Sequence, residues 1–129
     1  MRKLWAIIAG FVAALAITIG VEYISHVLYP PPAHLNPLDP ADLEQLLELM
    51  PTGAMLLVIA AHFLAVLIGN WVLLKIAKGY QQGVYILTGG FFLLAIMNVV
   101  MVGHDTWFLI ADAAAILLAG GWMYKRSIA

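Results

Sequence analysis

Four long apolar stretches constrain this chain more than any other feature of its sequence. They run over residues 4–28, 52–76, 84–102 and 106–124. Each is long enough for a helix, at about 1.5 Å per residue, to cross roughly 30 Å of hydrocarbon. Lipid cannot satisfy an open strand edge, and the alternating pattern of a membrane barrel is absent. We therefore predict an all-α polytopic membrane protein, an antiparallel bundle of four transmembrane helices forming one membrane domain over residues 1–129.

Composition excludes several other classes of protein. Hydrophobic residues make up 64% of the chain and charged residues 10%, against about 25% charged in soluble domains. A chain this small cannot bury so much apolar surface, and a disordered chain needs the opposite composition. The net charge of -1 does not indicate a basic surface of the kind that binds nucleic acid. The absence of cysteine excludes disulfides, thiolate metal sites and cysteine nucleophiles.

The first apolar stretch begins as a secretory signal peptide would, with Arg2 and Lys3. However, it is longer than the usual signal core of about 7–15 residues, it contains Glu22, and no Ala-x-Ala site precedes the prolines. We expect it to be retained as a transmembrane helix.

The basic residues predict the orientation. With four crossings, all six fall on one side of the membrane, and they are Arg2, Lys3, Lys75, Lys78, Lys125 and Arg126. By the positive-inside rule that side is cytoplasmic, so both termini are expected there. Five of the seven acidic residues fall on the opposite side.

The outer connection over residues 29–51 is the longest of the three. It opens with three prolines at 30–32, which cannot continue a helix and favour an extended chain. Asp39 followed by Pro40 is a favourable helix start. Residues 41–50 then predict a short amphipathic helix, on the outer membrane surface or covering the bundle.

Polar residues within the spans are the functional candidates, because they are costly in lipid. The candidate ligand or proton site comprises Glu22, His26, His62, Asn98 and Asp112. Thr18, Ser25 and Tyr29 extend the stripe of Glu22 and His26 on one helix face. Counting from the outer helix ends places Glu22 and Asp112 about 9 Å deep and His62 about 15 Å deep. The sequence therefore predicts a polar cluster open to the outside. His34 and His104 are expected to be solvated loop residues.

Three hypotheses fit this cluster. The first is a small membrane protein that binds or translocates a proton, cation or small polar ligand. The second is a structural or accessory subunit whose polar residues bond between helices, with Glu22 paired to His26 or to a partner chain and Asp112 to Asn98. The third and weakest is a membrane enzyme with a transition metal on Glu22, His26, His62 and Asp112. Motifs of soluble enzymes are absent, and no catalytic residue is predicted.

Small residues predict close helix packing. Ala111, Ala115 and Ala119 form a line at four-residue spacing, and Gly89 and Gly90 add small positions to the preceding span. They favour internal packing or a homo-oligomer interface. Four helices enclose little space, so a transporter of this size is expected to assemble as a dimer or larger complex.

A set of short motifs resembles a group of small four-helix bacterial membrane proteins. These motifs comprise the residues 26–32 His-Val-Leu-Tyr-Pro-Pro-Pro, then Ala61-His62, Gly69, Asn98, Trp107-Phe108 and Asp112. The resemblance implies a bacterial inner-membrane location, and it implies no activity.

Overall fold

The computed structural model describes residues 1–103 and 105–128, apart from the side chain of Val102. The expected loop histidine at position 104 lies outside the described residues. The described part is entirely helical, which confirms the predicted fold class. Its five helices are α1 (Arg2–Leu28), α2 (Pro40–Leu49), α3 (Thr52–Ile76), α4 (Gln81–Val102) and α5 (Thr106–Ile128).

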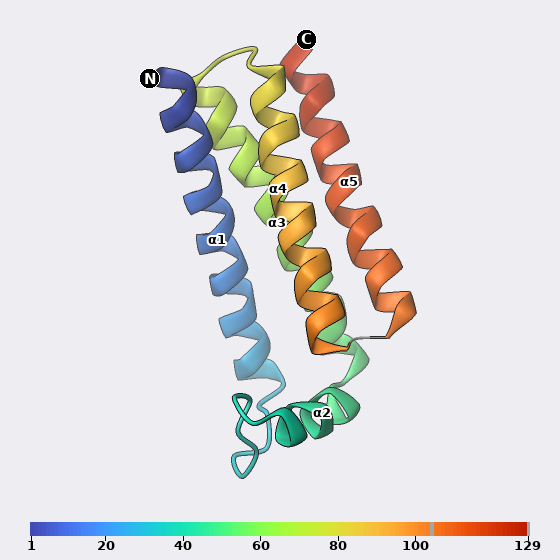
Figure 1. Cartoon of the computed structure of the whole chain (residues 1–129). Helices are drawn as coiled ribbons and strands as arrows, with labels where there is room; N and C mark the ends of the chain where they lie inside the picture. The colour runs from blue at the N-terminus through green and yellow to red at the C-terminus, as the bar shows by residue number, and fades with distance from the viewer. Residues whose placement is uncertain (104, 129) are drawn as a thin grey trace.

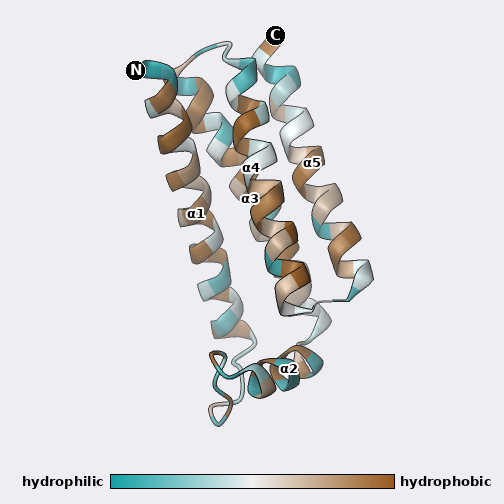
Figure 2. Ribbon diagram, viewed as in Figure 1, coloured by the Kyte–Doolittle hydropathy of each residue, from teal (hydrophilic) through white to brown (hydrophobic). Residues whose placement is uncertain are grey.

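Four of these helices are long and apolar enough to cross a membrane, namely α1, α3, α4 and α5. Both termini and the α3–α4 turn lie at one end of the bundle, here named the inner end after the predicted orientation, and α2 lies across the other end, named the outer end (Figure 1). Hydrophobic residues occupy most of the length of the four long helices, whereas hydrophilic residues are concentrated at the inner end of the bundle and around α2 (Figure 2). This is the architecture of an integral membrane protein whose outer helix surfaces contact lipid.

Three long helices extend beyond the apolar runs at the inner end. α1 begins at Arg2, α4 begins at Gln81 and α5 ends at Ile128, whereas the apolar runs start at residues 4 and 84 and end at residue 124. Polar residues continue a helix readily once it leaves the hydrocarbon, so apolar length underestimates helix length.

The tightest packing joins α1 to α3. Ala6, Gly10 and Ala14 are buried on one face of α1, at four-residue spacing. A Cβ atom on Gly10 would lie 2.8 Å from the carbonyl oxygen of Gly69 on α3. Only glycine allows two backbones to approach this closely, and in lipid such contact is a main source of helix association.

The small residues singled out from the sequence play a smaller part. Ala119 is buried in the core, whereas Ala111 and Ala115 are half-buried. A Cβ atom on Gly89 would meet nothing within 4 Å, and one on Gly90 would meet only Phe11. The closest approach between two backbones therefore lies on α1 and α3, whereas buried Gly120 of α5 packs closely against the Thr88 side chain of α4.

The inner end is closed by contacts between α1 and the end of α3. Arg2 Nε donates a hydrogen bond to the carbonyl oxygen of Ile76 at 2.5 Å. This carbonyl belongs to the last turn of α3, where carbonyl groups lack helical partners. The ammonium group of Lys3 lies 5.0 Å from the ring centre of Tyr80.

The outer end is covered by α2, which starts as the sequence predicts. The Asp39 side chain accepts a hydrogen bond from the Ala41 amide at 3.0 Å, and Pro40 occupies the first helical position. None of the α2 residues is fully buried. Its half-buried residues Leu43, Leu46 and Leu47 alternate with exposed acids along the helix, so α2 lies across the bundle with its apolar face inward.

Candidate functional site

A cavity of about 720 Å³ opens in the outer half of the bundle. Cavities that bind small molecules typically measure about 300–1,000 Å³. One wall is a single face of α1, formed by Leu15, Thr18, Glu22, Ser25, His26 and Tyr29. The facing walls come from Ala54, Val58 and His62 of α3 and from Phe91, Leu94, Ala95, Asn98 and Val99 of α4. The apolar side of α2 and the proline-rich loop close the outer end.

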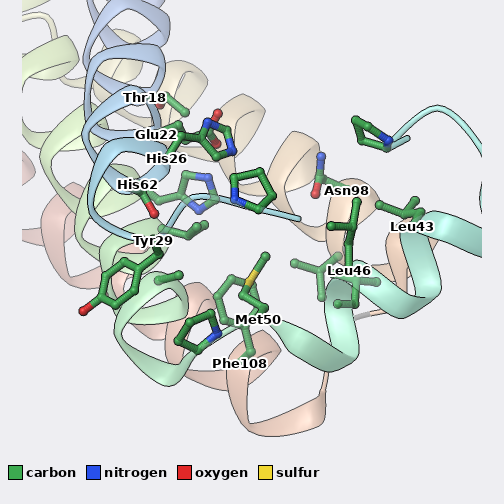
Figure 3. A pocket seen from close by; sticks show the side chains of 18 of the residues that line it. Thr18, Glu22, His26, Tyr29, Leu43, Leu46, Met50, His62, Asn98 and Phe108 are labelled. Carbon is green, nitrogen blue, oxygen red and sulfur yellow. The ribbon is translucent and has the colours of Figure 1, made fainter. Parts of the chain in front are cut away.

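The cavity has a polar end and an apolar end. Thr18, Glu22, His26 and His62 lie close together in Figure 3, whereas the α2 side chains and Met50 lie across the cavity from them. The polar stripe predicted on residues 4–28 therefore lines the cavity. Its members share a face because they recur at helical spacing of three and four residues.

His62 and Asp112 form the central pair of this site. The His62 Nδ1 atom lies 2.6 Å from Asp112 Oδ1, which joins α3 to α5. Asp112 is 2% exposed, and it lies behind His62 rather than in the cavity wall. The ring of Phe91 packs edge-on against the imidazole, with 5.5 Å between ring centres. The carboxylate and the phenyl ring together fix the orientation of the His62 ring.

This arrangement leaves one imidazole nitrogen for chemistry. Nδ1 is occupied by Asp112, and the structure records no hydrogen bond for Nε2 among the residues it describes. When Nδ1 donates to the carboxylate, Nε2 carries a lone pair that accepts a hydrogen bond or a proton. In that tautomer, His62 can accept a hydrogen bond at the cavity wall through Nε2.

The other predicted residues are brought to the same cavity without bonding to one another. Glu22 is half-buried, whereas His26 and Asn98 are exposed at its edge. Within the described part of the chain, none of the three has a hydrogen bond or an ion pair. The pairings expected for a purely structural cluster, Glu22 with His26 and Asp112 with Asn98, are not formed.

Counting residues from the helix ends did not indicate that His62 and Asp112 meet. It set His62 about 6 Å deeper than Asp112, yet their side chains are in contact. The count assumes that α3 and α5 begin at the same level in the membrane, and helices in a bundle need not do so.

The predicted metal ligands do not converge. Among residues 1–103 and 105–128, no three histidine, aspartate or glutamate side chains come together as a metal site would require. Of the four candidate ligands Glu22, His26, His62 and Asp112, only His62 and Asp112 touch.

A second polar pair lies deeper in the bundle, near the inner half. Asn70 Nδ2 donates to the Val66 carbonyl oxygen and to Thr88 Oγ1, each at 3.0 Å, and both side chains are buried. This bond joins α3 to α4 and does not reach the cavity. In the sequence, the polar residue at position 70 is the one indication of this hydrogen bond, and no pattern indicates its partner.

The apolar wall formed by α2 is the part of the cavity that the sequence did not indicate. The apolar face of that helix predicts only that it packs on the membrane surface or on the bundle. A second hollow of about 750 Å³ lies on its other side, near Glu48, Asp105 and Trp107. α2 therefore separates two hollows at the outer end of the molecule.

Comparison with known proteins adds no relative: no family model, curated protein or solved structure matches the chain. The resemblance to small four-helix bacterial proteins stays a prediction.

Proposed function

We propose that this membrane protein binds a small amphipathic molecule in its outer-half cavity, with the His62–Asp112 pair as the polar anchor. The cavity faces the outside if the termini are cytoplasmic, as the distribution of lysine and arginine predicts. We further propose a bacterial inner membrane as its location, on the resemblance described above.

The observation that carries this proposal is the arrangement of His62. Its Nδ1 is bound to a buried carboxylate at 2.6 Å, while its ring lines a cavity of about 720 Å³. A histidine that served only to join helices would have no need of an adjacent cavity. The mixture of mainly apolar walls with a few converging polar groups is typical of small-molecule sites.

Binding is better supported than translocation. Inward of His62 the bundle closes in an apolar cluster of Ala14, Ala65, Val66, Phe91, Ala95, Ile116 and Ala119. Ala65 and Val66 lie about one turn inward of His62, and Ile116 lies one turn inward of Asp112. An ion or proton would have to cross this layer without polar partners, which is costly in a membrane. The arrangement favours a site reached from one side.

A structural role is the second candidate function. The Asn70–Thr88 bond between α3 and α4 supports it, because that pair is buried and has no access to a cavity. Bonds of this kind stabilise helix association by about 0.6 kcal/mol on average. Under this hypothesis the same chain would act as a subunit of a membrane complex.

Photolabelling of the protein in lipid nanodiscs tests the binding proposal. The probe is neutral 4-(hydroxymethyl)benzophenone, whose excited ketone reacts readily with methionine side chains. Met50 lines the cavity, and Met97, exposed on α4, reports contact from the surrounding lipid. We expect more labelling at Met50 than at Met97, measured by mass spectrometry of peptides from the same sample.

A matched pair of α2 variants provides the control. Leu46→Trp fills the cavity, because Leu46 is half-buried in its wall, whereas neighbouring Gln45 is exposed and outside that wall. We expect Leu46→Trp to reduce the Met50-to-Met97 ratio and Gln45→Trp to leave it unchanged. Equal labelling of Met50 and Met97 in the unmodified protein would contradict the proposed function.

A further inference from the structure

The charges around the cavity indicate which class of molecule it takes. All six lysine and arginine residues of the chain lie in or near the turns and termini at the inner end, in positions 2, 3, 75, 78, 125 and 126. The cavity wall contains Glu22, and Asp112 lies behind His62, which is another residue of that wall. No lysine or arginine lines the cavity as the structure describes it, and Glu22 is its only carboxylate. Its other polar groups, such as Ser25 and Asn98, both donate and accept hydrogen bonds.

Glu22 has no counter-ion among the residues that the structure describes. It lies six residues from the outer end of α1, about 9 Å along the helix axis. A carboxylate at such a depth is costly unless a positive charge or hydrogen bonds compensate it. The groups that share this side of the cavity are His26 on α1, His62 on α3 and the Asp112 carboxylate behind His62. No hydrogen bond or ion pair joins Glu22 to any of the three.

The net charge at the polar end of the cavity is negative whether His62 is neutral or protonated. With a neutral imidazole, Glu22 and Asp112 together carry two negative charges. With an imidazolium, the His62–Asp112 pair is neutral and the charge of Glu22 remains. His26 lies at the exposed edge of the cavity, where water solvates its ring and weakens its effect on Glu22. The polar end of the cavity is thus complementary to a positive charge.

The rest of the cavity excludes a small hydrated cation. Most of its lining is apolar, including Leu15, Val58 and Leu94, and no cluster of metal ligands occurs in the described part of the chain. The occupant must therefore carry an apolar body beside its charge. The rings of Phe91 and Tyr29 in the wall add aromatic surfaces of the type that attract organic cations.

We infer that the cavity selects lipophilic organic cations, with the positive charge at Glu22 and His62 and the apolar body against α2. This inference rests on the proposed function and narrows it to one class of ligand.

Three probes with the same photoreactive group test the inference. They are cationic (4-benzoylbenzyl)trimethylammonium, neutral 4-(hydroxymethyl)benzophenone and anionic 4-benzoylbenzoate. The measured quantity is the ratio of Met50 to Met97 labelling in nanodiscs of neutral lipid, which corrects each probe for its own partitioning into the bilayer. We expect the ratio for the cation to exceed that for the anion by roughly fivefold or more, as a partly desolvated ion pair would give.

Two carboxylate variants assign this preference to a residue. Glu22→Gln removes the charge in the cavity wall, and Glu48→Gln removes an exposed charge on α2 that lies outside that wall. We expect Glu22→Gln to abolish the cation preference and Glu48→Gln to preserve it. A thermal unfolding midpoint of Glu22→Gln in detergent equal to that of the unmodified protein shows that this variant keeps its fold.

The outcomes separate the two proposals. Equal ratios for cation and anion, with strong labelling by the neutral probe, would overturn the inference and leave the binding function standing. A cation preference that survives Glu22→Gln would also overturn it. Failure of all three probes to label Met50 above Met97 would contradict the proposed function itself, and the inference with it.

Discussion

Two pairs of polar residues join helices of the bundle, and they differ in their exposure to the cavity and in the kind of hydrogen bond they form. His62 and Asp112 are in contact at 2.6 Å, and one of them lines a cavity. Asn70 and Thr88 bond at 3.0 Å and are both buried. The first pair includes an ionisable acceptor, and charge-assisted hydrogen bonds are shorter and stronger than neutral ones. The two pairs should therefore differ in energy as well as in exposure.

Double-mutant cycles measure that difference. For Asp112→Leu combined with His62→Leu we expect a coupling energy of about 1–2 kcal/mol, toward the upper limit for interhelical bonds in membranes. For Asn70→Leu combined with Thr88→Val we expect about 0.6 kcal/mol, the average for such bonds. The free energies of unfolding are measured by reversible denaturation in mixed micelles. Equal coupling energies for the two pairs would argue against a charge-assisted His62–Asp112 bond.

At the scale of helices, contact between α1 and α3 depends on two glycines. Gly10 faces the Gly69 backbone, where an added methyl group has no space, whereas a Cβ atom on Gly20 of the same helix would meet nothing within 4 Å. α1 forms one wall of the cavity, so its position on α3 also determines how far the polar stripe stands from His62.

Alanine substitutions at these two α1 positions should have opposite effects. Gly10→Ala places a methyl group 2.8 Å from a backbone oxygen, and we expect it to destabilise the protein by about 1–3 kcal/mol, as overpacking does. Gly20→Ala should be neutral or should stabilise it by up to about 1 kcal/mol, since alanine favours helix. Thermal unfolding in detergent gives the comparison. Equal stability of the two variants would show that α1 does not pack on α3 through Gly10.

Different helices were predictable from the sequence to different degrees. Asp39 before Pro40 predicts the start of α2, and the spacing of Thr18, Glu22 and Ser25 predicts the polar face of α1. The Gly10–Gly69 contact was not predictable, because most of α1 and α3 is apolar on every side and no periodicity marks the packed face. The His62–Asp112 contact was missed for a related reason: its geometry depends on how α3 and α5 rotate and shift against each other.

At the scale of the whole molecule, the two ends of the bundle differ in charge. The inner end carries every lysine and arginine, and the outer end carries α2 with its exposed acids. The cavity lies in the half of the bundle next to the second end, while the apolar cluster around Ile116 closes the bundle behind it. The molecule is therefore asymmetric along the membrane normal, as a site reached from one side requires.

The orientation itself can be tested with introduced thiols, because the chain contains no cysteine. Leu38 in the outer loop is 90% exposed, and Lys78 lies in the turn between α3 and α4. We expect a membrane-impermeant maleimide to label Leu38→Cys in intact bacterial spheroplasts, and Lys78→Cys only after permeabilisation. The reverse pattern would place the cavity on the cytoplasmic side.

We propose that Asp112 fixes the His62 ring through Nδ1, while Nε2 remains accessible to a ligand. Nitrogen-15 NMR of the histidine-labelled protein in nanodiscs tests it most directly, with the cationic benzophenone probe added in the dark. We predict a hydrogen-bonded Nδ1 and a free Nε2 in His62, with a change in the Nε2 signal on addition of the probe. Leu46→Trp should abolish that change. A His62 signal that does not respond to the probe at saturating concentration would contradict the account.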